Sequence, residues 1–122
     1  MCGITGYVGS RHALPLALEQ LRKLEYRGYD SAGVAFPDAT RVQVVKSVGK
    51  IAGLDPLVAG LGQGCGTAVA HTRWATHGRP STENAHPHAD CRGQIAVVHN
   101  GIIENYLSLR ARLEAAGHLF QS

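Results

Sequence analysis

The hydrophobic and polar positions in the first half of the chain switch between strand-like and helix-like patterns. Residues 3–9 form a short apolar run that predicts a strand, with a turn at its end. Over residues 12–26 leucines recur at helical spacing while the charged side chains fall mainly elsewhere, which predicts an amphipathic helix that breaks at residues 27–30. Residues 31–36 and 42–48 predict two strands joined by a short turn-rich link, and therefore a β-hairpin.

The second half mixes the same two patterns with longer irregular stretches. Residues 50–61 carry a weaker helical pattern, and a proline inside it either interrupts or begins the helix. Strands are predicted at residues 67–71 and 95–99, with a long polar loop over residues 72–92 between them. A last helix is predicted over residues 104–116, and the glycine that follows it is the expected C-cap. The pattern as a whole predicts a protein of mixed helices and strands.

Composition narrows the class of protein. The 122 residues fall within the size of one domain. No run of about 18 apolar residues and no basic-then-apolar leader occurs, so we expect a protein that is neither exported nor membrane-spanning. Cys2, Cys65 and Cys91 are widely spaced, which favours a reducing compartment over a disulfide framework and makes the cytoplasm the expected location. The net charge is +3 without any basic stripe, so nucleic acid is not an expected partner.

Cys2 offers a nucleophile at the start of the chain. Removal of Met1, which is usual before a small residue, would leave Cys2 with both a thiol and a free α-amine. An α-amine titrates near neutrality, at about pKa 7.7 to 8.0, so it can accept the proton of its own thiol directly or through one water. The alternative is that Cys2 is a small apolar residue at the start of a strand.

A second candidate site follows the strand predicted at residues 67–71, in the sequence TRWATHG of residues 72–78. A loop just past a strand end can cover a pocket. Arg73 carries a planar guanidinium, which binds a carboxylate through two parallel hydrogen bonds. The alternative is a surface arginine stacked on Trp74.

Asn100 and Gly101 follow the strand predicted at residues 95–99. One interpretation is an oxyanion hole, in which the Asn100 side-chain amide and the Gly101 backbone N–H point at the oxygen that becomes negative during acyl transfer. Each such donor stabilises the transition state by roughly 3 to 4 kcal/mol. The alternative is a turn that tolerates positive φ, which is the usual meaning of Asn-Gly.

Other constellations carry less chemistry. The glycine-rich residues 60–66 lack the following lysine and hydroxyl residue of a phosphate-binding loop. The two histidines that flank Pro87, taken with Cys91, lack the CxxC or helical HxxxH spacing of a metal site, so no metal is expected. His71 and His99 each end a strand and are expected to be structural histidines.

Five sequence blocks, in this order, resemble the glutaminase domain of glucosamine-6-phosphate synthase, the isomerising glutamine:fructose-6-phosphate aminotransferase. The blocks are residues 2–9 (CGITGYVG), 24–33 (LEYRGYDSAG), 71–78 (HTRWATHG), 84–88 (NAHPH) and 98–105 (VHNGIIEN). The resemblance covers essentially the whole chain. The wider class includes amidophosphoribosyltransferase, asparagine synthetase and glutamate synthase, but the second and third blocks resemble the synthase specifically.

Members of this family are N-terminal nucleophile hydrolases. The resemblance therefore implies an α+β fold, a four-layer α/β/β/α sandwich of two antiparallel sheets between helices. It implies that Cys2 attacks the carboxamide of glutamine and that its own α-amine relays protons. It also implies that Asn100 and Gly101 hold the oxyanion.

The resemblance implies a set of substrate contacts as well. Arg73 would bind the carboxylate of glutamine with help from Thr76 and His77. Trp74 would lie on the mobile loop that closes the pocket. Arg27 would stabilise the position of the N-terminus without touching the substrate. No cofactor and no metal is implied.

We interpret residues 1–122 as part of a glutaminase domain that is incomplete at its C-terminal end. Residues 118–122 have the pattern of a new strand, and the Thr-Asp-Thr-Glu stretch whose aspartate binds the glutamine α-amine in this family is missing. The isomerase half, which uses the ammonia and fructose 6-phosphate, is absent. The full-length family protein is expected to be a homo-oligomer. Two alternatives stay open, namely a catalytically inert remnant and another class II amidotransferase.

Overall fold

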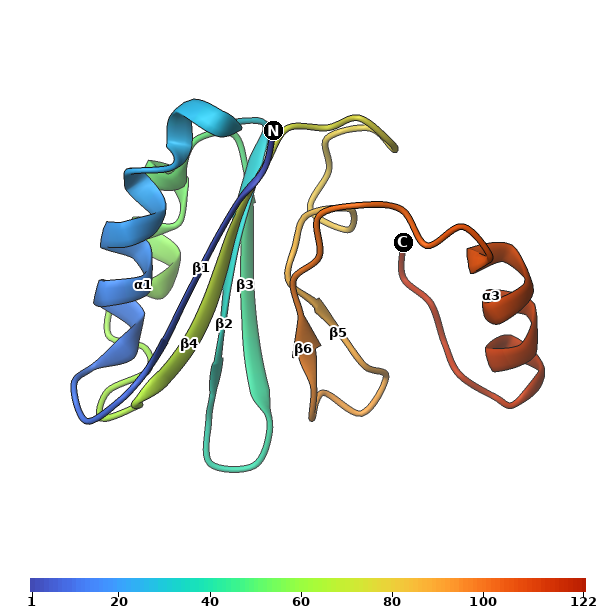
Figure 1. Cartoon of the computed structure of the whole chain (residues 1–122). Coiled ribbons are helices and arrows are strands. Elements are labelled where there is room, and N and C mark those ends of the chain that lie inside the picture. Colours follow the sequence, from blue (N-terminus) through green and yellow to red (C-terminus); the bar gives the residue numbers. More distant parts are fainter.

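Two antiparallel sheets lie between helices (Figure 1). The computed structural model describes residues 1–122. In chain order the elements, with η for a short 3-10 helix, are β1 (Gly3–Val8), α1 (Ala13–Arg22), η1 (Glu25–Arg27), β2 (Ser31–Pro37), β3 (Val42–Val48), η2 (Ile51–Gly53), α2 (Asp55–Val58), β4 (Thr67–Arg73), β5 (His88–Ala89), β6 (Ala96–Val97) and α3 (Tyr106–Ala115). From left to right in Figure 1, α1 with α2, the larger sheet, the smaller sheet and α3 follow one another in the order α/β/β/α.

The larger sheet has four antiparallel strands in the order β1-β4-β2-β3. Gly3 at the start of β1 pairs with Thr72 near the end of β4, and Ser31 at the start of β2 pairs with Arg73. One end of the sheet therefore gathers the N-terminus, the end of β4 and the start of β2. This register places residue 2 beside the segment that follows β4.

Helix α1 covers one face of this sheet. Its buried residues recur at spacings of one, three and four, which places them on a single stripe of the helix. That stripe packs against apolar side chains of β2, β4, η2 and α2. The core contains Ala13, Leu14, Ala17, Leu18, Leu21, Ala32, Val34, Phe36, Ile51, Leu54, Val58, Ala68 and Ala70. Burying each of the larger side chains contributes about 1.5–3 kcal/mol.

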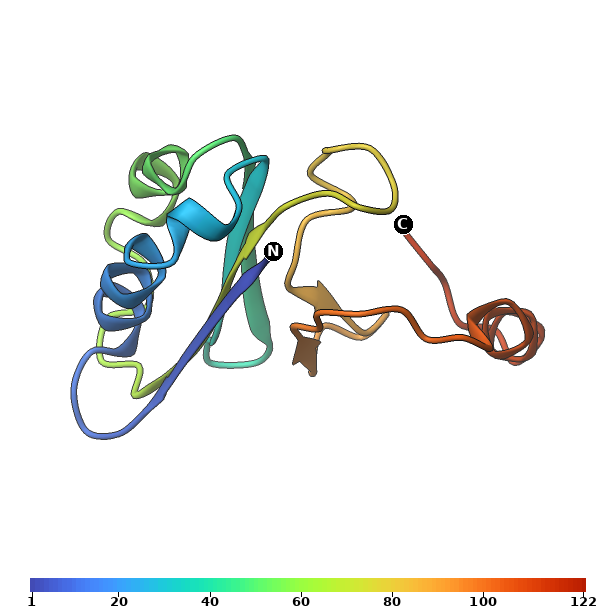
Figure 2. The same ribbon diagram turned by 45° about the horizontal axis from the view of Figure 1, so that its top comes forward.

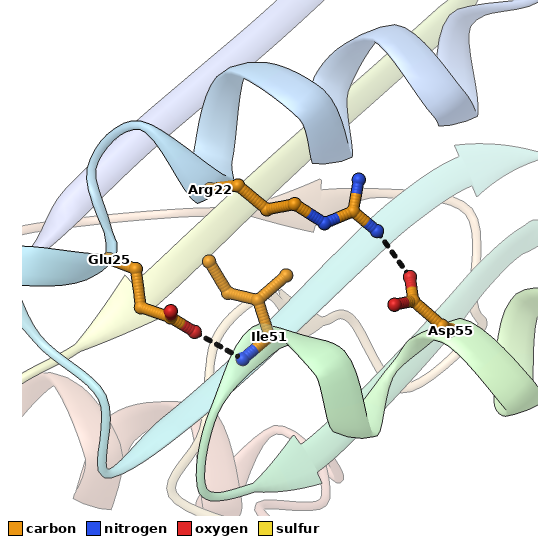
Figure 3. Close-up of polar contacts among 4 residues, drawn as sticks. All are labelled: Arg22, Glu25, Ile51 and Asp55. Carbon is orange, nitrogen blue, oxygen red and sulfur yellow. Dashed lines mark hydrogen bonds and ion pairs between the residues drawn. The ribbon is translucent and has the colours of Figure 1, made fainter.

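Two polar contacts connect α1 and η1 with α2 and η2 (Figure 3). The Arg22 guanidinium pairs with the Asp55 carboxylate. The Glu25 carboxylate accepts a hydrogen bond of 2.8 Å from the backbone N–H of Ile51. Exposed ion pairs stabilise a fold by only about 0–1 kcal/mol, so the Arg22–Asp55 pair contributes little. The Glu25 contact fixes the backbone of Ile51, whose side chain is in the core.

The two-stranded sheet of β5 and β6 lies on the face of the larger sheet opposite α1 (Figures 1 and 2). The segment that leads into β5 rests directly on β2. A Cβ atom added to Gly33 would overlap the backbone carbonyl oxygen of His86, so only glycine permits this approach. The contact explains why β2 is buried on both faces and reads as a continuous apolar run.

The strands and helices predicted up to residue 116 are present, but several of their ends differ, and the loop predicted over residues 72–92 contains the short strand β5. The strand predicted at residues 67–71 continues to Arg73 because Thr72 and Arg73 still pair with β2. The helix predicted at residues 12–26 ends at Arg22, where Lys23 and Leu24 donate 3-10-type hydrogen bonds to the carbonyls three residues before them. The sequence pattern of leucines could not show this tightening.

Of three later predictions, one is confirmed, one element is shorter than predicted and one is wrong. The helical pattern at residues 50–61 splits into η2 and α2, and its proline lies in the first turn of α2, which confirms the second of the two interpretations. The predicted strand at residues 95–99 shortens to the two residues of β6. The strand start predicted at residues 118–122 is wrong, because this segment is irregular and no strand lies beside it to pair with.

Helix α3 stands apart from the core (Figure 1). Gly117 follows it with a φ of 90°, and its backbone N–H donates to the carbonyl of Glu114, which confirms the predicted C-cap. No residue of α3 is buried, and no residue after Pro87 is buried anywhere in the chain. None of the helices has the length and apolar character that crossing a membrane requires.

Candidate active site

Cys2 lies at the end of the larger sheet where β4 finishes. The pairing of Gly3 with Thr72 brings its sulfur to the backbone of Trp74. The Trp74 N–H donates to the Cys2 Sγ at 3.4 Å, and the Sγ lies 3.6 Å from the Trp74 carbonyl oxygen. The thiol is half-buried, so it is neither a core residue nor freely exposed.

Asn100 reaches the same place from the opposite end of the chain. Its Nδ2 donates to the backbone carbonyl of Cys2 at 3.3 Å, and its Oδ1 lies 2.7 Å from the Nε2 of His71. The neighbouring Gly101 has a φ of 140°, a conformation that favours glycine, and its N–H makes no hydrogen bond within the chain. The structure therefore brings together Cys2 and Asn100, the predicted nucleophile and one predicted oxyanion donor, and the other predicted donor, Gly101, is next to Asn100 in the chain.

Arg73, the last residue of β4, points into the loop that follows it. Its guanidinium is nearly buried and donates to the backbone carbonyls of His77, Gly78 and Arg79, the last two at 3.3 and 3.4 Å. These hydrogen bonds close the loop upon the Arg73 side chain. Thr76 and His77 are exposed on the same loop, as is Trp74 at the loop's start.

The base of this loop is fixed by Asp30, a residue that the sequence analysis did not single out. Its carboxylate accepts hydrogen bonds from the backbone N–H of Ala75 and from the Ser31 hydroxyl, the latter at 3.0 Å. Its own N–H donates to the carbonyl of Arg73 at 3.1 Å. The only signal in the sequence was an acidic residue in the helix break before β2, and a solvated turn explains that equally well.

The turn before Asp30 packs against the end of β4. The carbonyl of Gly28 accepts a hydrogen bond from the Thr72 hydroxyl, and a Cβ atom on Gly28 would come within 2.6 Å of the Trp74 nitrogen. The ring of Tyr29 meets the indole of Trp74 edge to face at 5.4 Å. The polar contacts of Arg27 are instead with Tyr26, whose hydroxyl accepts from the Arg27 Nε at 3.3 Å, so the structure does not bring Arg27 into contact with Cys2.

Three histidine rings stack beneath Asn100. His71 and His86 lie 4.4 Å apart and nearly parallel, and His88 meets His86 edge to face at 4.4 Å. Burial lowers the pKa of all three rings. For His86, the neighbouring histidines and the cations of Arg73 and Lys46 add to burial and lower its pKa to about 3. The cluster is therefore neutral at physiological pH.

This cluster predicts how the stability of the fold depends on pH. In the unfolded chain these rings take up protons below their ordinary pKa of 6.5. In the folded chain their pKa values are lower, so they stay neutral to a lower pH. Stability is complete above about pH 6.5 and falls as the pH drops toward the lowered folded values, by at most about 1.4 kcal/mol per pH unit for each ring. Urea unfolding between pH 7 and pH 5, where most carboxylates stay ionised, should show this decline. In a His86→Phe variant the slope should be shallower, and an unchanged slope would contradict the prediction.

The histidines do not form a metal centre in this structure. No group of three or more His, Cys, Asp or Glu side chains has an arrangement that could hold a metal ion. A cavity of about 1020 Å³ lies elsewhere, between β3, residues 88–91 and the C-terminal segment, and none of the predicted site residues lines it. The predicted residues Cys2, Arg73 and Asn100 are instead at the end of the larger sheet.

Known proteins similar to this chain match it along its whole length. No protein-family profile matches it. The full 122 residues are 57% identical to the glutamine–fructose-6-phosphate aminotransferase (isomerizing) of Symbiobacterium thermophilum, and they are 55% identical to that of Aquifex aeolicus. The chain spans about one fifth of the length of these relatives.

Two solved structures share the fold. One is a glutamine phosphoribosylpyrophosphate amidotransferase from B. subtilis complexed with ADP and GMP, with a TM-score of 0.73, 26% identity and coverage of 98% of this chain and 26% of that one. The other is described as the allosteric regulatory enzyme of purine biosynthesis, with a TM-score of 0.75, 28% identity and coverage of 100% of this chain and 27% of that one. The likeness confirms the predicted α+β fold of the N-terminal nucleophile type.

Proposed function

We propose, for a chain that corresponds to the amino-terminal part of the isomerising glutamine–fructose-6-phosphate aminotransferases, that Cys2 hydrolyses glutamine to glutamate and ammonia. The observation that carries this proposal is the meeting of Cys2 and Asn100, which lie 98 positions apart in the sequence. A nucleophile placed beside a side-chain amide and an unpaired backbone N–H is the arrangement that acyl transfer requires.

The reaction begins once Met1 has been removed and Cys2 carries a free α-amine. The amine takes the thiol proton, the sulfur attacks the carboxamide carbon, and the carbonyl oxygen becomes an oxyanion facing the Asn100 Nδ2 and the Gly101 N–H. The C–N bond then breaks, and ammonia leaves with the proton from the α-ammonium group. Water, deprotonated by the same amine, attacks the thioester, releases glutamate and restores the thiol.

We assign the glutamine carboxylate to Arg73, with Thr76 and His77 beside it. In the structure the Arg73 guanidinium donates to carbonyls of its own loop, so binding requires the loop to exchange those carbonyls for the substrate carboxylate. A carboxylate is the stronger acceptor for a guanidinium, which favours the exchange. Trp74 begins this loop and contacts Cys2 through its backbone, so loop movement and nucleophile are coupled. Arg27 is assigned a supporting role for the N-terminus, transmitted through the turn at Gly28.

The fate of the ammonia is proposed from the names of the relatives. They transfer an amino group to fructose 6-phosphate, and we assign that step to the part of those proteins beyond the fifth that this chain matches. We expect an intact protein of this kind to act in the cytoplasm as a homo-oligomer.

The covalent intermediate provides the direct test. The intact protein containing these residues should release glutamate and ammonia in equal amounts from glutamine. Rapid acid quenching should leave a glutamyl group on the N-terminal peptide, detected by mass spectrometry, because the thioester forms on Cys2. A Cys65→Ala variant should keep the same adduct. Glutamate release without any adduct at Cys2 would contradict the proposal.

A further inference from the structure

His71, a buried residue of the larger sheet, contacts the side chain of Asn100. It lies on β4 with 1% of its surface exposed, between strands β1 and β2. Its Nε2 is 2.7 Å from the Asn100 Oδ1. Asn100 itself is exposed and belongs to a segment without buried residues, so this hydrogen bond connects a loosely held side chain to a rigid element.

The direction of the hydrogen bonds follows from the groups involved. The backbone carbonyl of Cys2 can only accept, so the amide end of Asn100 that faces it must be the Nδ2. The Oδ1 then faces His71, and the His71 Nε2 must carry the proton and donate it. The opposite amide orientation would set two oxygen acceptors against each other at Cys2.

The His71 ring is held in the state that this bond requires. The Nδ1 is buried without a partner, which suits the neutral tautomer that carries its proton on Nε2. The nearly parallel ring of His86, 4.4 Å away, fixes the orientation of the imidazole from one side. Burial lowers the pKa of His71, so the ring is neutral near pH 7.

We propose that His71 is a positioning residue, which orients the Asn100 amide so that its Nδ2 is directed at the reacting centre beside Cys2. The inference rests on the proposed function, in which Asn100 supplies an oxyanion donor. His71 touches neither Cys2 nor the substrate, and it acts only through the Asn100 Oδ1. Because a donor misplaced by about 1 Å can cost a hundredfold in rate, fixing this amide contributes directly to catalysis.

The test compares two substitutions at position 71 in the intact protein. Glutamine places an N–H donor near the position of the histidine Nε2, whereas leucine fills a similar volume without a donor. His71→Leu should lower kcat for glutamate release by about ten- to hundredfold while KM changes by less than about threefold, because the lost interaction matters in the transition state. His71→Gln should recover most of that loss. His12→Leu, at the opposite end of the sheet, serves as the packing control and should leave both constants unchanged.

A double substitution separates positioning from simple damage to the fold. His71→Leu combined with Asn100→Ala should be no slower than Asn100→Ala alone, because His71 acts only through that amide. Multiplicative losses, or a His71→Gln variant as slow as His71→Leu with equal thermal stability, would overturn the proposal.

The proposal and the proposed function fail in different ways. If the unmodified protein shows no Cys2-dependent glutamate release, the function fails. The positioning role is then decided by a crystal structure of His71→Leu, in which the Asn100 amide should have turned away from the Cys2 carbonyl. An amide that keeps its place in that variant overturns the positioning role, whatever the activity.

Discussion

Replacing Cys2 with alanine is expected to abolish glutamate release from glutamine, with a loss in kcat of at least about ten-thousandfold. The alanine has no sulfur to form the thioester, and the remaining oxyanion donors cannot supply a nucleophile. Because the thiol is half-buried and makes only two weak contacts with the Trp74 backbone, the free energy of unfolding should change by less than about 1 kcal/mol. Steady-state release of glutamate and urea unfolding measure the two quantities separately.

Cys91→Ala is the matched control, since it removes an exposed thiol away from the end of the larger sheet. It should retain full activity. Residual turnover above a few per cent in Cys2→Ala would mean that another group performs the attack, and the proposed mechanism would be wrong.

Asn100→Ala should produce the second largest loss, about 100- to 1000-fold in kcat, or about 3–4 kcal/mol of transition-state stabilisation. The variant removes the Nδ2 donor near Cys2 and leaves the buried ring of His71 without its acceptor. KM should change little, because the oxyanion exists only in the transition state and the intermediate. Steady-state kinetics at saturating glutamine would measure the effect.

Asn105→Ala provides the comparison for this prediction. Asn105 is also exposed, lies in the same segment and makes no side-chain cap to α3, so its loss should leave kcat unchanged. Equal losses in the two variants would point to disturbance of the segment and not to a missing oxyanion donor.

The sequence predicted the parts of this fold that depend on local pattern. The β2–β3 hairpin and the first strand follow from apolar runs bounded by turn residues, and α1 follows from the spacing of its leucines. The ends of α1 and β4 depended on tertiary contacts instead. Thr72 remains in a strand because β1 and β2 lie on either side of it, and no pattern within β4 carries that information.

For the candidate site too, the sequence predicted some features, and others depend on tertiary structure. Cys2, Asn100 and Gly101 were named from their chemistry, but only the β1–β4 register and the path through β5 and β6 bring them together. The inward turn of Arg73 and the role of Asp30 depend on backbone carbonyls and amides of a loop, and the identity of side chains in the sequence does not specify those. Resemblance to a family supplied the roles that local physics left open.

No residue after Pro87 is buried, so the stability of the fold and the order of the segment that carries Asn100 can change independently. The apolar surface exposed on global unfolding, and hence the denaturant m-value, comes from the larger sheet with α1. Helix α3 has ten residues, fewer than the roughly 12–15 at which an isolated helix becomes marginally stable in water, so its amides should exchange with solvent through local opening. We therefore expect that a compound or mutation that loosens residues 98–115 stops the proposed reaction, which needs Asn100, and leaves the denaturant midpoint of global unfolding unchanged.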